Sequence, residues 1–133
     1  MASIKKMEMA AALSENNYIQ IQKSLFGLKK TAYSVDTRSE IECFVFDYSP
    51  SEGDKMLHLL NKSIADIANE LSVGHKPQKA DIGNYRMECC VSKDRQFFAV
   101  QLFHYADFQY TPATNLKVFR GKDVETMAKL ADL

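Results

Sequence analysis

The chain contains three cysteines and three histidines, residue types that commonly supply nucleophiles, general bases and metal ligands. Cys89 and Cys90 are adjacent, and neighbours on a strand point to opposite faces, so they cannot both bind one metal ion without leaving strand geometry. No Cys-x-x-Cys or His-Glu-x-x-His spacing occurs. A zinc site would need His75 or His104 to converge on these thiols from distant segments. We therefore expect no metal site.

A cysteine–histidine nucleophile pair is the sharpest enzymatic hypothesis. Cys89 and His104 fall on the same face of a predicted hairpin, but Cys89 lies opposite Val100, two residue pairs from His104. A general base must lie within about 3 Å of the proton that it removes. We interpret His104 as a strand-end residue beside Tyr85, and His58 has no visible acid partner. We predict no catalytic residue and favour a non-enzymatic function, with a cysteine-dependent enzyme as an alternative.

The glycines are too scattered for a phosphate-binding loop. The five stand far apart in the chain, at Gly27, Gly53, Gly74, Gly83 and Gly121. Neither a P-loop nor a dinucleotide-binding fingerprint can be built from that spacing. We therefore expect no cofactor.

Aromatic residues between positions 85 and 110 form the candidate ligand-binding site. Tyrosine offers both apolar area and a hydroxyl, so such a group could line a pocket mouth or a contact patch. Simple packing at the sheet edge, beneath the loop that follows, is the alternative. The predicted site residues are Tyr85, His104, Tyr105, Phe108 and Tyr110.

The site depends on the register of a hairpin with strands 85–92 and 97–104 around the turn 93–96. Pairing Lys93 with Gln96 collects one almost wholly apolar face and places Tyr85 opposite His104. A slip by one residue would bury Arg86 on that face without compensation. We predict that Tyr85 and His104 pair at the end of the hairpin far from its turn.

The clearest helix prediction runs from Ser51 to Ser72. It begins with the cap residue Ser49, Pro50 at the first helical position and Glu52 three residues after the cap. Apolar residues then recur at helical spacing, at Met56, Leu57, Leu60, Ile64, Ile67, Ala68 and Leu71. Two further helices are predicted at 4–13 and 122–130.

Residues 15–28 are ambiguous. A helical stripe of Tyr18, Ile21, Leu25 and Leu28 fits slightly better than strand alternation, so we favour a helix, and a strand over 18–25 stays open. Segments 31–35 and 40–48 read as a hairpin around 36–39, and 116–119 as a last short strand after the loop 111–115. The strand 40–48 is apolar on both faces. It should be a central strand covered on both sides, or one face should meet a partner.

The predicted order is therefore α-β-β-α-β-β-β-α in a single domain, 1–133. Strands occur in antiparallel runs rather than alternating with helices, which indicates an α+β fold. This order of elements is similar to that of roadblock and profilin-like domains, and the similarity is one of order alone.

Charge and hydropathy limit the kinds of partner that we expect the chain to bind. Seventeen Lys and Arg balance seventeen Asp and Glu, so the chain lacks a general attraction to nucleic acid or anionic membrane. The apolar runs are too short to span a membrane, and the first residues lack the apolar region of a signal peptide. Three cysteines, an odd number, do not indicate a disulfide framework. We expect a cytoplasmic protein with reduced thiols.

Two basic clusters keep nucleic-acid binding open as an alternative, Lys23-Lys29-Lys30 and Lys117-Arg120-Lys122. Segment 7–25 also faintly resembles a helix-turn-helix, without the usual glycine in its turn. We favour a small interaction or regulatory binding module that acts as a homodimer or binds another protein. The missing catalytic set and the two-sided apolar strand 40–48 motivate this hypothesis.

Overall fold

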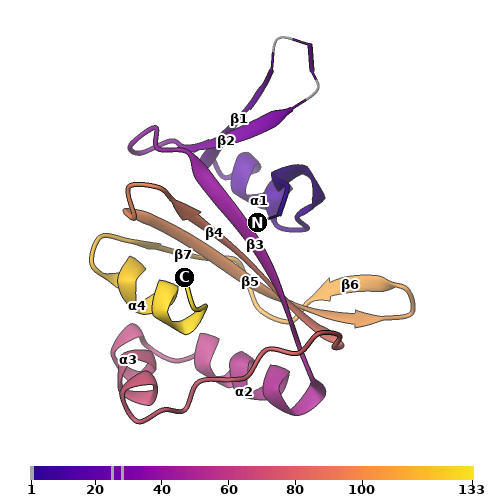
Figure 1. The fold of residues 1–133 in the computed structure, drawn as a ribbon, viewed down its shortest axis with the longest axis vertical. Helices are drawn as coiled ribbons and strands as arrows, with labels where there is room; N and C mark the ends of the chain where they lie inside the picture. Colours follow the sequence, from indigo (N-terminus) through magenta and orange to yellow (C-terminus); the bar gives the residue numbers. More distant parts are fainter. Residues whose placement is uncertain (1, 25, 28) are drawn as a thin grey trace.

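The computed structural model describes residues 2–24, 26–27 and 29–133 (Figure 1). Within these ranges it is an α+β fold, as predicted, with antiparallel strands throughout. The helical elements are a 3-10 turn η1 (Ile4–Lys6), α1 (Ala10–Glu15), α2 (Pro50–Leu60), α3 (Ile64–Ser72) and α4 (Asp123–Leu130). The strands are β1 (Ile19–Lys23), β2 (Lys30–Ser34), β3 (Ile41–Tyr48), β4 (Tyr85–Ser92), β5 (Phe97–Ala106), β6 (Gln109–Pro112) and β7 (Lys117–Arg120).

The central sheet has the order β3-β4-β5-β6, with β7 paired to the other half of β5. The predicted register of β4 and β5 is confirmed: Tyr85 pairs with His104 and Cys89 with Val100. This register is favoured because it assembles one apolar face. A slip by one residue would place Arg86 and Glu88 on that face.

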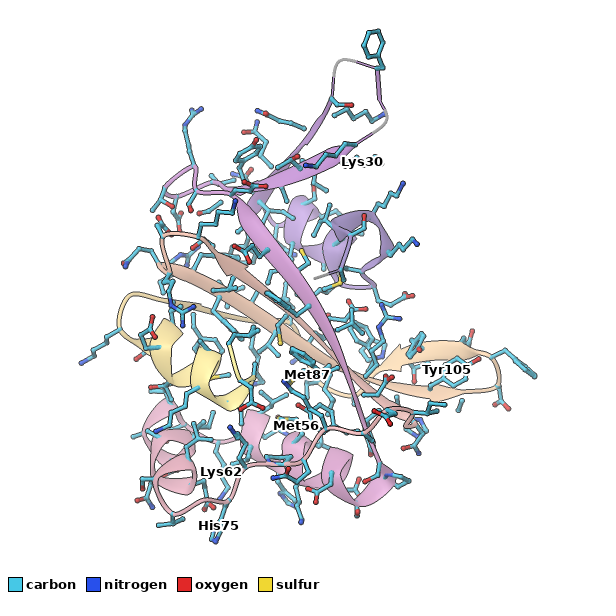
Figure 2. All side chains as sticks on the ribbon, in the orientation of Figure 1. Lys30, Met56, Lys62, His75, Met87 and Tyr105 are labelled. Carbon is cyan, nitrogen blue, oxygen red and sulfur yellow. The ribbon has the colours of Figure 1, made fainter. Side chains whose placement is uncertain are left out.

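Each face of the sheet is covered (Figure 1). On one side α2, α3 and α4 build what we call the helix-side core, where Met56 and Met87 meet between α2 and the sheet (Figure 2). On the other side η1, α1 and the β1–β2 hairpin build the N-terminal-side core, which includes Leu13 and Ile19. The sheet is thus the middle layer of three.

Strand β3 corrects one prediction. It lies at the sheet edge rather than in the centre: it pairs with β4 on one side, and its other side shows only isolated bridges from Ala2 and Ala80 among the described residues. Both faces are nevertheless covered within the chain, with Phe44 in contact with the helix-side core and Cys43 in the other. The two-sided apolar pattern therefore needs no partner, and this argument for a dimer falls.

The predicted helix 51–72 is two helices. Ser49 caps α2 as expected, accepting a hydrogen bond from the Glu52 amide at 3.3 Å. The chain then breaks at residues 61–63, where Ser63 caps α3 by accepting from the Asp66 amide at 3.2 Å. The apolar spacing hides this break, because three residues are close to one helical turn and the stripe continues in phase.

The preferred helix over residues 15–28 is wrong, and the open alternative of a strand is right. Strand β1 pairs with β2 from Ile19–Ser34 to Lys23–Lys30. Asn17, at φ 60°, ends the preceding helix, and Ile19 is buried while Gln20 is exposed, the alternation of a half-covered strand. Leu25 and Leu28, which complete the helical stripe, lie outside the described residues.

Two other differences come from tertiary pairing. The predicted first hairpin is reduced to one bridge between Tyr33 and Glu40, because β2 pairs with β1 instead. The predicted helix 4–13 is split into η1 and α1. The Glu8 and Met9 amides, which lie between these two elements, donate hydrogen bonds to the buried Glu88 carboxylate instead of to helix carbonyls. Strand β7 and helix α4 lie where they are predicted, within one residue at each end.

Candidate functional site

The five predicted site residues lie on one hairpin and the strand beside it. Tyr85 is the first residue of β4, His104 and Tyr105 are near the end of β5, Phe108 is in the turn, and Tyr110 is on β6. The β5–β6 hairpin projects sideways from the sheet (Figure 1) and carries Tyr105 (Figure 2). The sequence prediction missed this second strand, treating the segment as an aromatic run that leads into a loop.

Tyr85 and His104 form the base of this region on the helix side. Their rings meet edge to face, with centroids 5.2 Å apart. The Tyr85 hydroxyl donates a 2.7 Å hydrogen bond to the Asp54 carboxylate on α2, and this bond raises the pKa of Tyr85. A Cβ at Gly53 would lie 1.9 Å from the Tyr85 ring, so helix and ring touch directly. Tyr85 therefore anchors α2 to the sheet.

Tyr105 and Tyr110 lie on the opposite face. They are directly paired across β5 and β6, with ring centroids 4.8 Å apart. The Arg86 guanidinium lies over the Tyr110 ring at 4.7 Å, close enough for a cation–π contact. The four strand residues of the predicted site thus divide between the two faces of the sheet, and Phe108 lies in the turn beyond them.

Arg86 links the hairpin to a buried charge. Its guanidinium contacts the Glu88 carboxylate at 2.8 Å and donates to the Lys6 carbonyl at 3.2 Å. Glu88 is fully buried and also accepts hydrogen bonds from the Glu8 and Met9 amides, at 3.0 and 2.9 Å. This network ties β4, β6 and the N-terminal segment together, and the hairpin base is therefore held in place.

The tip of the hairpin differs from its base. Ala106 pairs with Gln109, which leaves a turn of Asp107 and Phe108 between them. Both turn residues have positive φ, 52° and 63°, the requirement of a type I′ turn, whose favoured sequences are Asn-Gly and Asp-Gly. Asp107 fits this preference and Phe108 does not. The Phe108 side chain is 95% exposed.

Two cavities lie elsewhere. One, of about 500 Å³, lies by α2, α3 and the following loop, where Lys62 and His75 are labelled in Figure 2. Its charged groups pair with one another, since Glu70 contacts His75 at 2.7 Å and Lys62 at 3.4 Å. The other, of about 410 Å³, lies between the N-terminal segment, β2 and β3, and is lined by Cys43 and by lysines that include Lys30. None of the five predicted site residues lines either cavity.

The cysteines lie in the interior. All three are free and buried, Cys89 in the helix-side core and Cys43 with Cys90 in the other. Burial raises the pKa of the Cys89 thiol far above its usual range, which suppresses the thiolate that a nucleophile needs. Within the described ranges, no three or more His, Cys, Asp or Glu side chains gather in a way that could hold a metal ion.

The basic clusters named from the sequence have different surroundings. Lys29 and Lys30 line the smaller cavity, whereas Arg120 pairs with the Asp36 carboxylate and lies over the Tyr18 ring at 5.6 Å. Nucleic-acid binding therefore gains no specific support from the geometry.

No protein-family model, curated protein or solved structure matches this chain. Among the residues described, no helix combines the length and the apolar character needed to cross a membrane.

Sequence reasoning missed the Arg86–Glu88–Tyr110 network. The prediction places Arg86 and Glu88 on the polar face of the hairpin, and that face turns out to be covered by the N-terminal segment. A signal was available in the β5–β6 turn, because Asp107 is a good first residue for a type I′ turn. The signal is weak because Phe108 occupies the second turn position, where glycine is expected.

Proposed function

We propose that this chain is a non-enzymatic protein-interaction module that forms a homodimer through the tip of its β5–β6 hairpin. The observation that carries the proposal is Phe108, a large apolar side chain in a backbone conformation that disfavours it, with 95% of its surface exposed. Neither the turn nor the core accounts for phenylalanine at this position.

The energetic argument has two parts. A non-glycine residue at positive φ costs on the order of 1–2 kcal/mol, which glycine would avoid. An exposed aromatic ring regains nothing from the core, whereas at an interface the same ring can bury on the order of 150–250 Å². Aromatic residues, phenylalanine among them, are enriched in the buried cores of protein interfaces. A partner surface would therefore compensate for a residue that the free fold does not need.

The surroundings of the tip suit such a contact. Tyr105 is partly exposed on the same hairpin, and Ile82, 90% exposed, lies two residues from Asn84, whose carbonyl accepts a hydrogen bond from the Tyr105 amide. The rigid base described above presents the tip in one orientation, which lowers the entropy cost of association.

A second copy of the chain is the partner that we favour. The net charge is zero, so two copies meet without overall repulsion. In a two-fold arrangement the same patch serves on both sides, and the two Phe108 tips would pack against each other. This contact replaces the strand 40–48 as the predicted dimer surface.

The test is the molar mass in solution, measured by light scattering and sedimentation equilibrium at micromolar concentration. We expect twice the 15.1 kDa of the chain for the wild type. Phe108→Gly should weaken the dimer by roughly 30-fold or more, the loss expected from a hot-spot residue. Phe26→Ala is the matched control, because Phe26 is also exposed and belongs to the other projecting hairpin segment; it should leave the dimer intact.

A wild type that stays at 15.1 kDa under these conditions would refute the homodimer. Equal weakening by Phe26→Ala and Phe108→Gly would remove the assignment to the β5–β6 tip.

A further inference from the structure

Cys43 and Cys90 face each other across strands β3 and β4. They are direct partners in the register, and their sulfur atoms lie 3.4 Å apart. Both side chains belong to the N-terminal-side core and are almost fully buried. The pair was not visible in the sequence, where Cys90 is notable only as the neighbour of Cys89.

The backbone geometry at this pair is the kind that accepts a disulfide. Glu40 directs its carbonyl toward β4, accepting from the Lys93 amide, so alternate residues from Ile41 onward direct theirs away. The Cys43 carbonyl accordingly accepts from the Ala2 amide on the outer side. Cys43 and Cys90 are therefore a non-hydrogen-bonded pair, whose Cα atoms lie about 4.5 Å apart in antiparallel sheets. Disulfides span Cα separations of about 4.4–6.8 Å.

We propose that Cys43 and Cys90 form a modification site that closes to an intramolecular disulfide when the chain meets a small hydroperoxide. The cavity of about 410 Å³ between the N-terminal segment, β2 and β3 is lined by Cys43 and provides the approach for a small neutral oxidant. Cys89 cannot take part, because its side chain lies in the helix-side core on the opposite face.

The chemistry balances in two steps. The Cys43 sulfur attacks one peroxide oxygen and the O–O bond breaks; that oxygen stays on Cys43 as a sulfenic acid, and the displaced hydroxide takes the Cys43 proton and leaves as water. The Cys90 sulfur then attacks the sulfenic sulfur, the S–S bond forms, and the displaced hydroxide takes the Cys90 proton and leaves as a second water. Two thiols lose two electrons in total, and the peroxide receives both.

Cys90 is held as a thiol until oxidant arrives. The hydrogen bond to Cys43 and burial both raise the pKa of Cys90, so little thiolate exists at neutral pH. The second step, in which the Cys90 sulfur attacks the sulfenic acid, should therefore become faster as pH rises. The disulfide would join the edge strand β3 covalently to β4. The chain segment that it closes into a loop contains both α2 and α3, since Cys43 precedes these helices and Cys90 follows them.

The test uses the full chain treated with hydrogen peroxide, quenched in acid, unfolded and alkylated, with intact mass as the readout. We expect the reduced chain to take up three alkyl groups and the oxidised chain one. Trypsin leaves Cys89 and Cys90 in one peptide, 87–93, so Cys89→Ala decides the assignment. This variant should still form the crosslink to Cys43 and should then take up no alkyl group, whereas Cys90→Ala should form none.

Three alkyl groups on the peroxide-treated wild type would overturn the proposal, as would a crosslink that survives in Cys90→Ala. A crosslink between two chains on a non-reducing gel would overturn it too, and this readout is separate from the mass of the non-covalent dimer. As a measurement without any variant, the wild type should unfold at a higher temperature after oxidation than after reduction.

Discussion

Strand β5 connects two turns that share a feature, a non-glycine residue at positive φ, and differ in its surroundings. In the turn 93–96 this residue is Arg95, at φ 57°, whose guanidinium makes two hydrogen bonds to the Glu125 carboxylate, at 2.7 and 3.1 Å. The hydroxyl of Ser92, the last residue before this turn, donates to Asp94 and accepts from the Phe97 amide. Contacts with the rest of the fold therefore compensate for the backbone conformation.

At the other end of β5, Phe108 has the same conformation, and its side chain is 95% exposed. The contrast is informative because turn strain is common wherever the fold compensates for it, and only uncompensated strain points to a function. The difference is confined to the tip, since the base of the β5–β6 hairpin is fixed by Arg86 and Glu88.

The largest expected effect tests that base. Glu88→Ala removes the buried carboxylate and leaves the Arg86 guanidinium and the Glu8 and Met9 amides without it, which should lower the free energy of unfolding by about 3–5 kcal/mol. Denaturant unfolding followed by circular dichroism measures this loss. Glu88→Gln, which retains one acceptor oxygen, should lose less. A change below 1 kcal/mol for Glu88→Ala, on the scale of ordinary surface substitutions, would show that the base is not held by this charge.

The next effect concerns the compensated turn. Ser92→Ala removes the acceptor for the Phe97 amide and the donor to Asp94 at a buried position, and should lower the free energy of unfolding by about 1–3 kcal/mol. Ser14→Ala, at an exposed position of α1, is the matched control and should change stability by less than about 0.5 kcal/mol. Equal effects of the two substitutions would weaken the contrast between the turns.

The uncompensated turn should respond in the opposite direction. Phe108→Gly relieves roughly 1–2 kcal/mol of backbone strain and gives back roughly 0.5–1 kcal/mol through the more flexible unfolded chain, so the monomer should gain up to about 1.5 kcal/mol. Arg95→Gly has the same backbone relief but loses the Glu125 pair, and should gain less. The free energy of unfolding should be measured at protein concentrations low enough to keep the wild type and the variants monomeric. A loss of stability in Phe108→Gly would contradict the argument for an interface residue.

The smallest effect is a pH dependence in the compensated turn. Hydrogen bonds from the Ser92 and Thr37 hydroxyls lower the pKa of Asp94 below its usual value near 4. Its contribution to stability is therefore complete above the unfolded pKa and is lost as pH falls through the lower folded pKa. Asp94→Asn should be less stable than the wild type at neutral pH. The gap should shrink in denaturant titrations as pH falls below 4, and a gap independent of pH would exclude this linkage.

Prediction from the sequence succeeded where a pattern is local or self-consistent. The β4–β5 register was predictable because one pairing alone collects Met87, Cys89 and Val91 against apolar partners. The Ser49 cap was predictable because its donors lie within three residues. Asp107 was a weaker signal of the β5–β6 turn, because the glycine that usually follows it in such a turn is absent.

Prediction failed where a distant segment chooses between local alternatives. Residues 19–23 fit two periodicities about equally, and pairing with β2 selected the strand. The two faces of β3 looked like a partner surface, and the N-terminal segment, far along the chain from the helices, supplied the second cover. His104 and Tyr105 are neighbours in the chain, and the alternation of strand faces places them on opposite sides of the sheet.

By itself, the sequence determined the α+β class, the register of the central hairpin, the last strand and the last helix, because short-range periodicity and capping contain that information. Only the tertiary structure decided which strands pair across the chain, that Glu88 is buried beneath the N-terminal segment, and that Cys43 lies 3.4 Å from Cys90. The physical reason is that these contacts join residues far apart in sequence. Their free energy depends on how layers pack, which no local pattern encodes.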